Sequence, residues 1–142
     1  MKQYKVVIDT NVLVTGLRSN KGASFKLLEN IGSSKFQPVV SVPLVFEYEA
    51  ALIFDKTNSG LSTQDVRDVL DYLCSVSSQA KISYLWRPQL TDPKDDFVLE
   101  LAVNGQCDFI ITYNKRDFLE AKKFRVKIIN PKDFLLLIGG IL

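Results

Sequence analysis

The sequence contains no histidine among its 142 residues. This absence excludes Ser-His-Asp and Cys-His catalytic units, a histidine general base and any histidine metal ligand. The two cysteines, Cys74 and Cys107, lie far apart in the sequence, which also excludes a CxxC redox motif and a four-thiolate zinc site. Catalysis by this chain would therefore use carboxylates, amides, hydroxyls, lysine or arginine, together with a hard cation.

Long apolar runs are missing as well. No run approaches the roughly 20 residues that a membrane span needs, and no apolar segment of signal-peptide length precedes the first charge. We therefore expect a cytoplasmic protein with reduced thiols and no membrane association. The length predicts a single domain over residues 1–142. The formal net charge of +2 is too small to indicate nucleic-acid binding by itself.

The sequence does contain short apolar runs that alternate with helical patterns. Alternating strands and helices are typical of α/β proteins, and near-continuous apolar strands indicate a parallel sheet that is covered on both faces. The predicted fold is thus a three-layer α/β/α arrangement with a mostly parallel central sheet. We expect strands over residues 4–8, 37–42, 82–86, 109–112 and 126–129, and helices over 23–31, 44–54, 62–76, 92–105 and from 131 onward.

Polar residues follow two of the predicted strands at their carboxyl ends, where parallel sheets gather their functional sites. Asp9 ends the first strand, and Asn11 lies two residues further on. Thr112 ends the fourth strand and is followed by Asn114 and Asp117. Taken singly, each acid is best explained as a helix cap or a first-turn residue. Taken together, they favour a shared acidic site.

Two further segments add carboxylates. Glu47 lies in a helix that is apolar over much of its circumference, where a glutamate needs a partner or a metal ion. Asp95 and Asp96 begin the helix that precedes the fourth strand. Two like charges about 4 Å apart cost about 4 kcal/mol at an effective dielectric constant near 20. A divalent cation would offset this repulsion, and oxygen-only ligands suit Mg²⁺ or Mn²⁺.

Four segments that contain these acids resemble the motifs of a known family. They are residues 7–13, 41–49, 92–102 and 107–118. Together they resemble the PIN domain, a metal-dependent ribonuclease fold, and most of all the bacterial PIN-family toxins of toxin–antitoxin pairs. The resemblance implies RNA cleavage by a metal-activated water that leaves 5′-phosphate and 3′-hydroxyl ends. It also implies a homodimer and an antitoxin protein as a partner.

The resemblance also implies roles for individual residues. Asp9, Glu47, Asp96 and Asp117 would form the catalytic pocket and bind Mg²⁺ or Mn²⁺, with Asn11, Thr112 and Asn114 as polar supports. Many members of the family have an aspartate where this chain has Asn114, so either Asn114 or Asp117 completes the site. Asp95 is a rival to Asp96, because a shift of one residue on a helix turns the side chain by about 100°.

RNA binding requires cations outside the acidic pocket. The predicted phosphate contacts are Arg18 and Lys21, in the loop expected after the Asp9 motif, and Lys115 and Arg116 in the fourth motif. Tyr113 is placed to stack on a base or to pack against the sheet. The helix over residues 61–76 and the apolar tail over residues 134–142 are either core elements or association surfaces.

Two other functions compete with the ribonuclease. Phosphotransferases of the haloacid dehalogenase type also start with a strand that ends in aspartate, but their general acid lies two residues later. That position is Asn11 here, and an amide cannot protonate a leaving group. The second alternative is a catalytically inactive PIN-fold module that binds RNA or a protein. Asn114 favours it, and the complete acidic set argues against it.

Overall fold

Five short strands form one parallel sheet with β1 at its centre. The computed structural model describes residues 3–80 and 93–139, except for the side chains of Pro93, Lys94, Asp96, Glu120 and Lys122. The strand order is β3-β2-β1-β4-β5, and every pair is parallel. The strands are β1 (Tyr4–Ile8), β2 (Phe36–Val40), β3 (Ser78–Gln79), β4 (Phe109–Ile111) and β5 (Lys127–Ile129).

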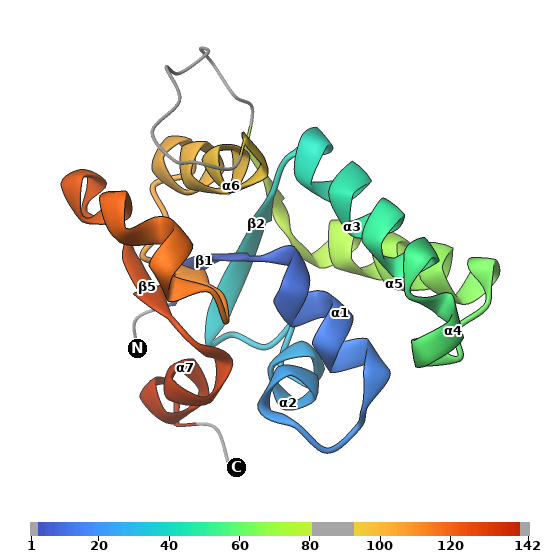
Figure 1. Cartoon of the computed structure of the whole chain (residues 1–142). Helices are drawn as coiled ribbons and strands as arrows, with labels where there is room; N and C mark the ends of the chain where they lie inside the picture. The colour runs from blue at the N-terminus through green and yellow to red at the C-terminus, as the bar shows by residue number, and fades with distance from the viewer. Residues whose placement is uncertain (1–2, 81–92, 140–142) are drawn as a thin grey trace.

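Helices cover both faces of the sheet. They are α1 (Thr10–Arg18), α2 (Ala23–Glu29), α3 (Val42–Phe54), α4 (Lys56–Ser59), α5 (Thr63–Val76), α6 (Pro93–Asn104), the 3₁₀ segment η1 (Lys115–Phe124) and α7 (Pro131–Leu137). Figure 1 shows α6 on one side of β1 and β2, with α1, α2 and α7 on the other. The right-handed crossovers that are the rule between parallel strands would produce this division, because the chain moves outward in one direction from β1 to β3 and in the opposite direction from β3 to β5. The predicted three-layer α/β/α fold is confirmed.

Local signals set the helix starts. Ser62 and Asp65 form a capping box at the start of α5, in which each side chain accepts a hydrogen bond from the other residue's backbone N–H. Ser41 caps α3, because its hydroxyl accepts a hydrogen bond from the N–H of Leu44. This cap moves the start of α3 two residues ahead of the predicted position and ends β2 at Val40, whereas the prediction extended that strand to residue 42.

The structure adds to or differs from the sequence patterns in three other segments. The strand predicted over residues 82–86 lies outside the described residues, while β3 forms earlier, where Ser78 and Gln79 pair with Val39 and Val40. The loop position predicted for Arg18 is wrong, because this residue ends α1, whereas Lys21 does lie between α1 and α2. The segment over residues 55–60 looks loop-like in sequence but contains α4, which ends at Gly60 in the left-handed region with a φ of 75°.

The apolar C-terminal segment contributes to the core. Phe134 in α7 is fully buried, and its ring meets those of Tyr4, Phe36 and Phe109 edge to face at centroid distances of 5.3 to 6.2 Å. Leu136 in the same helix is 57% exposed. α7 therefore closes one face of the sheet with its inner side only.

The amphipathic pattern of α5 is also satisfied within the chain. Val66, Leu70 and Leu73 are buried, and the helix packs on α3 and β2. Tyr72 is half exposed, and its hydroxyl donates a hydrogen bond to the carbonyl of Ile31. Within the described part of the chain, no helix combines the length and apolar character that crossing a membrane requires.

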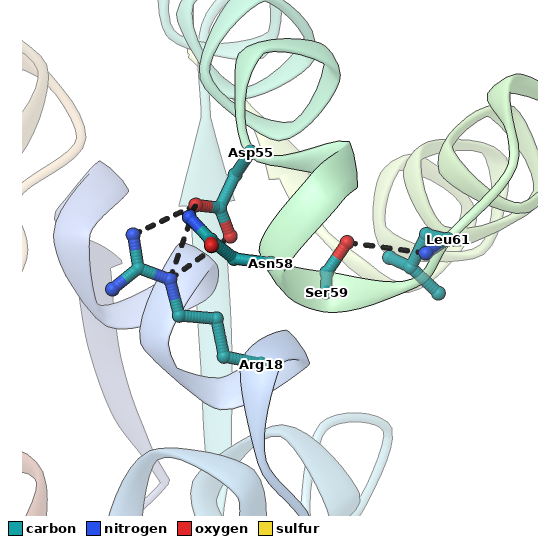
Figure 2. A network of polar contacts seen from close by, with 5 residues as sticks. All are labelled: Arg18, Asp55, Asn58, Ser59 and Leu61. Carbon is teal, nitrogen blue, oxygen red and sulfur yellow. Dashed lines mark hydrogen bonds and ion pairs between the residues drawn. The ribbon is translucent and has the colours of Figure 1, made fainter.

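An ion pair joins α1 to the junction between α3 and α4. The guanidinium of Arg18 faces the carboxylate of Asp55, with Nε at 3.0 and 3.1 Å from its two oxygens and Nη2 at 2.7 Å from Oδ1 (Figure 2). Asn58 donates a further hydrogen bond to this carboxylate at 3.1 Å. The Asp55 side chain is only 5% exposed. Arg18 therefore lies in a helix with its charge paired, contrary to the loop position expected for a phosphate contact.

Removing the Phe134 ring should destabilise the fold. We expect Phe134→Ala to lower the free energy of unfolding by about 3 to 5 kcal/mol, because the substitution leaves a cavity among three aromatic rings. Leu136→Ala in the same helix should change it by less than about 1 kcal/mol, since that side chain is mostly exposed. Urea denaturation followed by circular dichroism measures both values. Equal losses for the two variants would contradict a core role for α7.

The Arg18–Asp55 pair should make stability depend on pH. Arg18 and Asn58 hold the pKa of Asp55 below its ordinary value of 3.8, so the pair stabilises the fold above that pH and loses its effect as the pH falls through the folded-state pKa. We expect Arg18→Gln to reduce the free energy of unfolding at pH 7 and to have a smaller effect below about pH 4, where Asp55 is protonated in the unfolded chain. Lys21→Gln serves as the control for loss of a nearby exposed cation. A pH-independent difference would show that the ion pair is not the cause.

Candidate active site

Asp9 occupies the point where β1 ends and α1 begins. Its backbone is extended (φ −65°, ψ 148°), and its Oδ1 accepts a hydrogen bond from the N–H of Thr10 at 2.9 Å. Its Oδ2 accepts a hydrogen bond from the hydroxyl of Thr112 at 2.7 Å. Asp9 is only 7% exposed. Three elements therefore fix this carboxylate: the central strand, the helix that it caps and the end of β4.

Other acids lie close enough to Asp9 to affect its ionisation. Burial raises the pKa of Asp9 above its ordinary value of 3.8, and the hydrogen bonds from Thr112 and Thr10 counteract part of that increase. The charges of Glu47 and Asp117 raise the pKa of Asp9 further. The structure thus brings three of the four predicted acids within electrostatic reach of one another.

Glu47 reaches the site from α3. Its Oε2 accepts a hydrogen bond from the hydroxyl of Thr10 at 2.9 Å, which links the Glu47 carboxylate to the residue that follows Asp9. The Glu47 side chain is half-buried, whereas Glu49 in the same helix is exposed. The sequence singled out Glu47 because a carboxylate in an apolar helix needs a polar partner, and Thr10 is such a partner.

Tyr48 secures α3 beneath these acids. Its ring is buried, and its hydroxyl donates a hydrogen bond to the carbonyl of Ile8 at 2.5 Å. Burial raises the pKa of Tyr48 well above its ordinary value of 10.0, and the charges of Asp9 and Glu47 add to the effect. Tyr48 is therefore a neutral donor that joins α3 to the last residue of β1.

The turn after β4 provides the second wall of the site. The buried hydroxyl of Thr112 accepts a hydrogen bond from the N–H of Asn114 at 3.0 Å, and the carbonyl of Asn114 accepts one from the N–H of Asp117 at 3.0 Å. The side chains of Asn114 and Asp117 are exposed. These bonds place both candidates for the fourth position on one turn, so the choice between Asn114 and Asp117 stays a prediction.

A polar pocket of about 590 Å³ adjoins this turn. Asp117 lines it beside two exposed cations, and the hydroxyl of Tyr113 makes a short hydrogen bond with the hydroxyl of Ser24 on α2. The bond anchors the end of a tyrosine ring that is 46% exposed. The residues that line the polar pocket are Tyr113, Asn114, Lys115, Arg116, Asp117 and Asn130.

The third motif lies in the first turn of α6, which packs on β1 and β4. Asp95 has a half-buried side chain there, whereas the side chain of Asp96 is outside the description. The choice between them thus stays open. One turn after Asp96, Glu100 is only 5% exposed, a buried carboxyl that the sequence analysis did not assign.

The donor set near Asp9 is compatible with a hard divalent cation. Its described members are carboxylate and amide oxygens, which suit Mg²⁺ or Mn²⁺. The Oδ1 of Asn11 is buried and has no hydrogen-bond partner within the described part of the chain, so this oxygen is available to bind a cation. Among the side chains that the structure describes, no three acids or thiols are grouped closely enough to hold a metal ion together.

The predicted cations differ in their surroundings. Lys115 and Arg116 line the polar pocket, and Lys21 is exposed in the turn between α1 and α2. Arg18 lies at the opposite end of α1 from Asp9, about 13 Å along the helix axis, and binds Asp55.

Sequence reasoning assigned no role to Thr10, Tyr48 or Ser24. Each is a hydroxyl that links two distant parts of the chain: α1 to α3, α3 to β1, and α2 to the turn after β4. Polar side chains beside buried segments were the available signal, since buried hydroxyls require partners. The identity of each partner required the fold.

Substituting Asp9 should stabilise the protein at neutral pH in the absence of divalent metal. Because the folded-state pKa of Asp9 is raised, its ionisation disfavours the fold, and this cost grows as the pH rises above the unfolded value near 4. We expect Asp9→Asn to raise the free energy of unfolding by about 1 kcal/mol at pH 7 in EDTA. The gain should disappear below about pH 4. Denaturant titrations across this pH range test it.

Asp65→Asn is the matched control. Hydrogen bonds to Ser62 lower the pKa of Asp65, so the same substitution there should destabilise the fold at pH 7 and have less effect in acid. A wild-type protein that is more stable than Asp9→Asn at pH 7 in EDTA would contradict the burial and repulsion described for Asp9.

Comparison with known proteins places this site in a family. No curated protein matches the chain. A sequence profile of the PIN domain matches residues 5–116, which is most of the chain and includes Asp9, Glu47, both acids at the start of α6 and Asn114. PIN domains have a nuclease-type fold, are generally hydrolases and typically use divalent metal ions. With this match over a parallel α/β/α sheet, the chain belongs to the PIN domain family.

Proposed function

We propose that the protein is an endoribonuclease that depends on Mg²⁺ or Mn²⁺ and hydrolyses RNA phosphodiesters in its carboxylate site. The observation that carries the proposal is the buried carboxylate of Asp9, whose pKa is raised by burial and by the charges of Glu47 and Asp117. A cation bound at the carboxyl edge of the sheet would offset the repulsion that Asp9 experiences from these two acids. Perturbed carboxylates at such an edge are typical of active sites.

The described residues supply ligands of the right type. Asp9 and Glu47 each retain lone pairs beyond the hydrogen bonds that orient them, and the Oδ1 of Asn11 is unpartnered among the described residues. Asp117 and either Asp95 or Asp96 would complete the set. A bound divalent cation lowers the pKa of a coordinated water and balances charge on the reacting phosphate.

The remaining residues orient the ligands and the substrate. Thr112 and Thr10 hold the two carboxylates by hydrogen bonds, which limits their freedom to rotate away from a cation. Lys115 and Arg116 line the polar pocket beside Asp117 and supply the positive charge that an RNA backbone requires. Tyr113, half exposed and anchored through Ser24, offers a ring for base stacking.

The proposal includes a biological role. The motifs around Asp9 and Asp117 resemble those of PIN-family toxins, so we propose that this ribonuclease acts as the toxin of a toxin–antitoxin pair. An antitoxin protein would then be its partner, and a homodimer its active form.

A second candidate function is RNA binding without turnover. Asn114 favours it, since an amide at this position keeps an oxygen but loses a charge. Cleavage activity distinguishes the two candidates.

Replacing Glu47 should abolish metal-dependent cleavage. We expect the purified protein to cleave a mixed RNA pool in Mn²⁺ but not in EDTA, leaving 5′-phosphate ends. Glu47→Gln should lower the rate at least about 100-fold, because substitutions that only touch the outer shell of a metal site already cost about 10- to 100-fold. Gel assays with end mapping of the products measure both effects.

Glu49→Gln is the matched control, since it makes the same change at an exposed position of the same helix. It should keep the wild-type rate. Cleavage that persists in EDTA or in Glu47→Gln would rule out this site as the source. RNA binding by the wild type without any cleavage would establish the second candidate. Asp117→Asn and Asn114→Asp in the same assay decide which residue completes the site.

A further inference from the structure

An apolar groove of about 640 Å³ lies between η1 and β5, outside the carboxylate site. We call it the η1–β5 groove. Its floor includes Phe118, Val126 and Phe109, which are 0%, 4% and 8% exposed, while Leu119 at its margin is 62% exposed. It is lined by Phe109, Lys115, Phe118, Leu119, Arg125, Val126, Lys127, Ile128 and Ile129.

The groove follows an edge of the sheet. β5 pairs only with β4 among the described strands. The N–H of Lys127 donates to the carbonyl of Asp108, and the carbonyl of Ile129 accepts from the N–H of Thr112, so both residues direct these groups toward β4. Because alternate residues of a strand direct their main-chain groups to opposite sides, Ile128 directs its N–H and carbonyl away from β4. An extended peptide alongside β5 would find both groups on this edge.

The margin of the groove is positively charged. Lys115, Arg125 and Lys127 line it and are exposed, and its described lining includes no acid. Arg125 holds its position with a φ of 63°, in the left-handed region that favours glycine. The groove therefore combines an apolar floor with three cations, which suits apolar side chains flanked by acidic ones.

We propose that the η1–β5 groove binds an extended segment of a partner protein in which acidic and apolar side chains alternate. This occupant fits better than RNA, because both phenylalanine rings are almost fully covered and offer no face for base stacking. It also fits better than a second copy of the chain. Two copies paired through β5 would bring Arg125 and Lys127 close to the same cations of the other copy, and like charges oppose such pairing.

The test measures binding of a synthetic peptide. A fluorescein-labelled peptide of alternating leucine and glutamate is titrated with the full-length protein and followed by fluorescence anisotropy. We expect saturable binding that weakens with added salt. A matched peptide with lysine for glutamate, and one with serine for leucine, should each bind at least about tenfold more weakly, a loss of about 1.4 kcal/mol.

Variants place the binding in the groove. Arg125→Gly should lower the affinity for the peptide at least about tenfold while keeping the fold, because glycine suits the backbone at this position. Lys127→Glu should lower the affinity by a similar factor. Lys132→Glu reverses an exposed charge on α7 that does not line the groove, and should leave the affinity unchanged. Lys115 is left intact because it also lines the polar pocket.

Several results would overturn the proposal. These are no binding of the leucine–glutamate peptide at about 1 mM protein, equal affinity for the glutamate and lysine peptides, or undiminished affinity in both Arg125→Gly and Lys127→Glu. Displacement of the peptide by single-stranded oligoadenylate would identify RNA as the occupant. A dimer that Leu119→Glu dissociates in sedimentation experiments would identify a second copy. None of these results depends on RNA cleavage, so the failure of one proposal leaves the other testable.

Discussion

The carboxylate of Asp9 is the constraint on which the candidate site depends. It is nearly buried, it repels Glu47 and Asp117, and its pKa is raised, so the fold is held in an electrostatically unfavourable arrangement. Hydrogen bonds from neighbouring residues hold the carboxylates in this arrangement. Thr112 and the N–H of Thr10 fix the two oxygens of Asp9, and the hydroxyl of Thr10 fixes Glu47. Carboxylates with perturbed pKa values are enriched at functional sites, and this one is held by hydrogen bonds from two elements.

Much of the scaffold could be predicted because it depends on local patterns. Apolar runs gave the approximate positions of β1, β2, β4 and β5, the capping segment at Ser62 gave the start of α5, and Pro131 gave the start of α7. The strand at Ser78 and Gln79 was not predictable, because two polar residues at a sheet edge carry no apolar signal and owe their conformation to the pairing with Val39 and Val40. α1 was missed, although Asp9 was considered as a helix cap, because several β-branched residues and Gly16 give this segment a low helix propensity.

The candidate site likewise contains residues that could be predicted from the sequence and residues that could not. Glu47 was identifiable from its own helix, since a carboxylate among apolar side chains requires an explanation. Asp9, Thr112 and Asp117 followed from the rule that parallel strands gather their sites at one edge. The hydroxyl partners and the pairing of Arg18 with Asp55 were not identifiable, because they join residues 37 or more positions apart. The choice between Asp95 and Asp96 turns on a helix register that sequence spacing alone does not define.

The order of the strands has a consequence for the protein as it is made. β1 is synthesised before the other strands but lies between β2 and β4. Asp9 at its end accepts a hydrogen bond from the hydroxyl of Thr112, which lies 103 residues later in the chain. A nascent chain that has not yet released Thr112 and Asp117 from the ribosome therefore cannot assemble these acids. A shorter nascent chain therefore contains Asp9 and Glu47 without the hydroxyl that holds Asp9 and without the third acid, so the geometry of the site arises only after residue 117 has been synthesised.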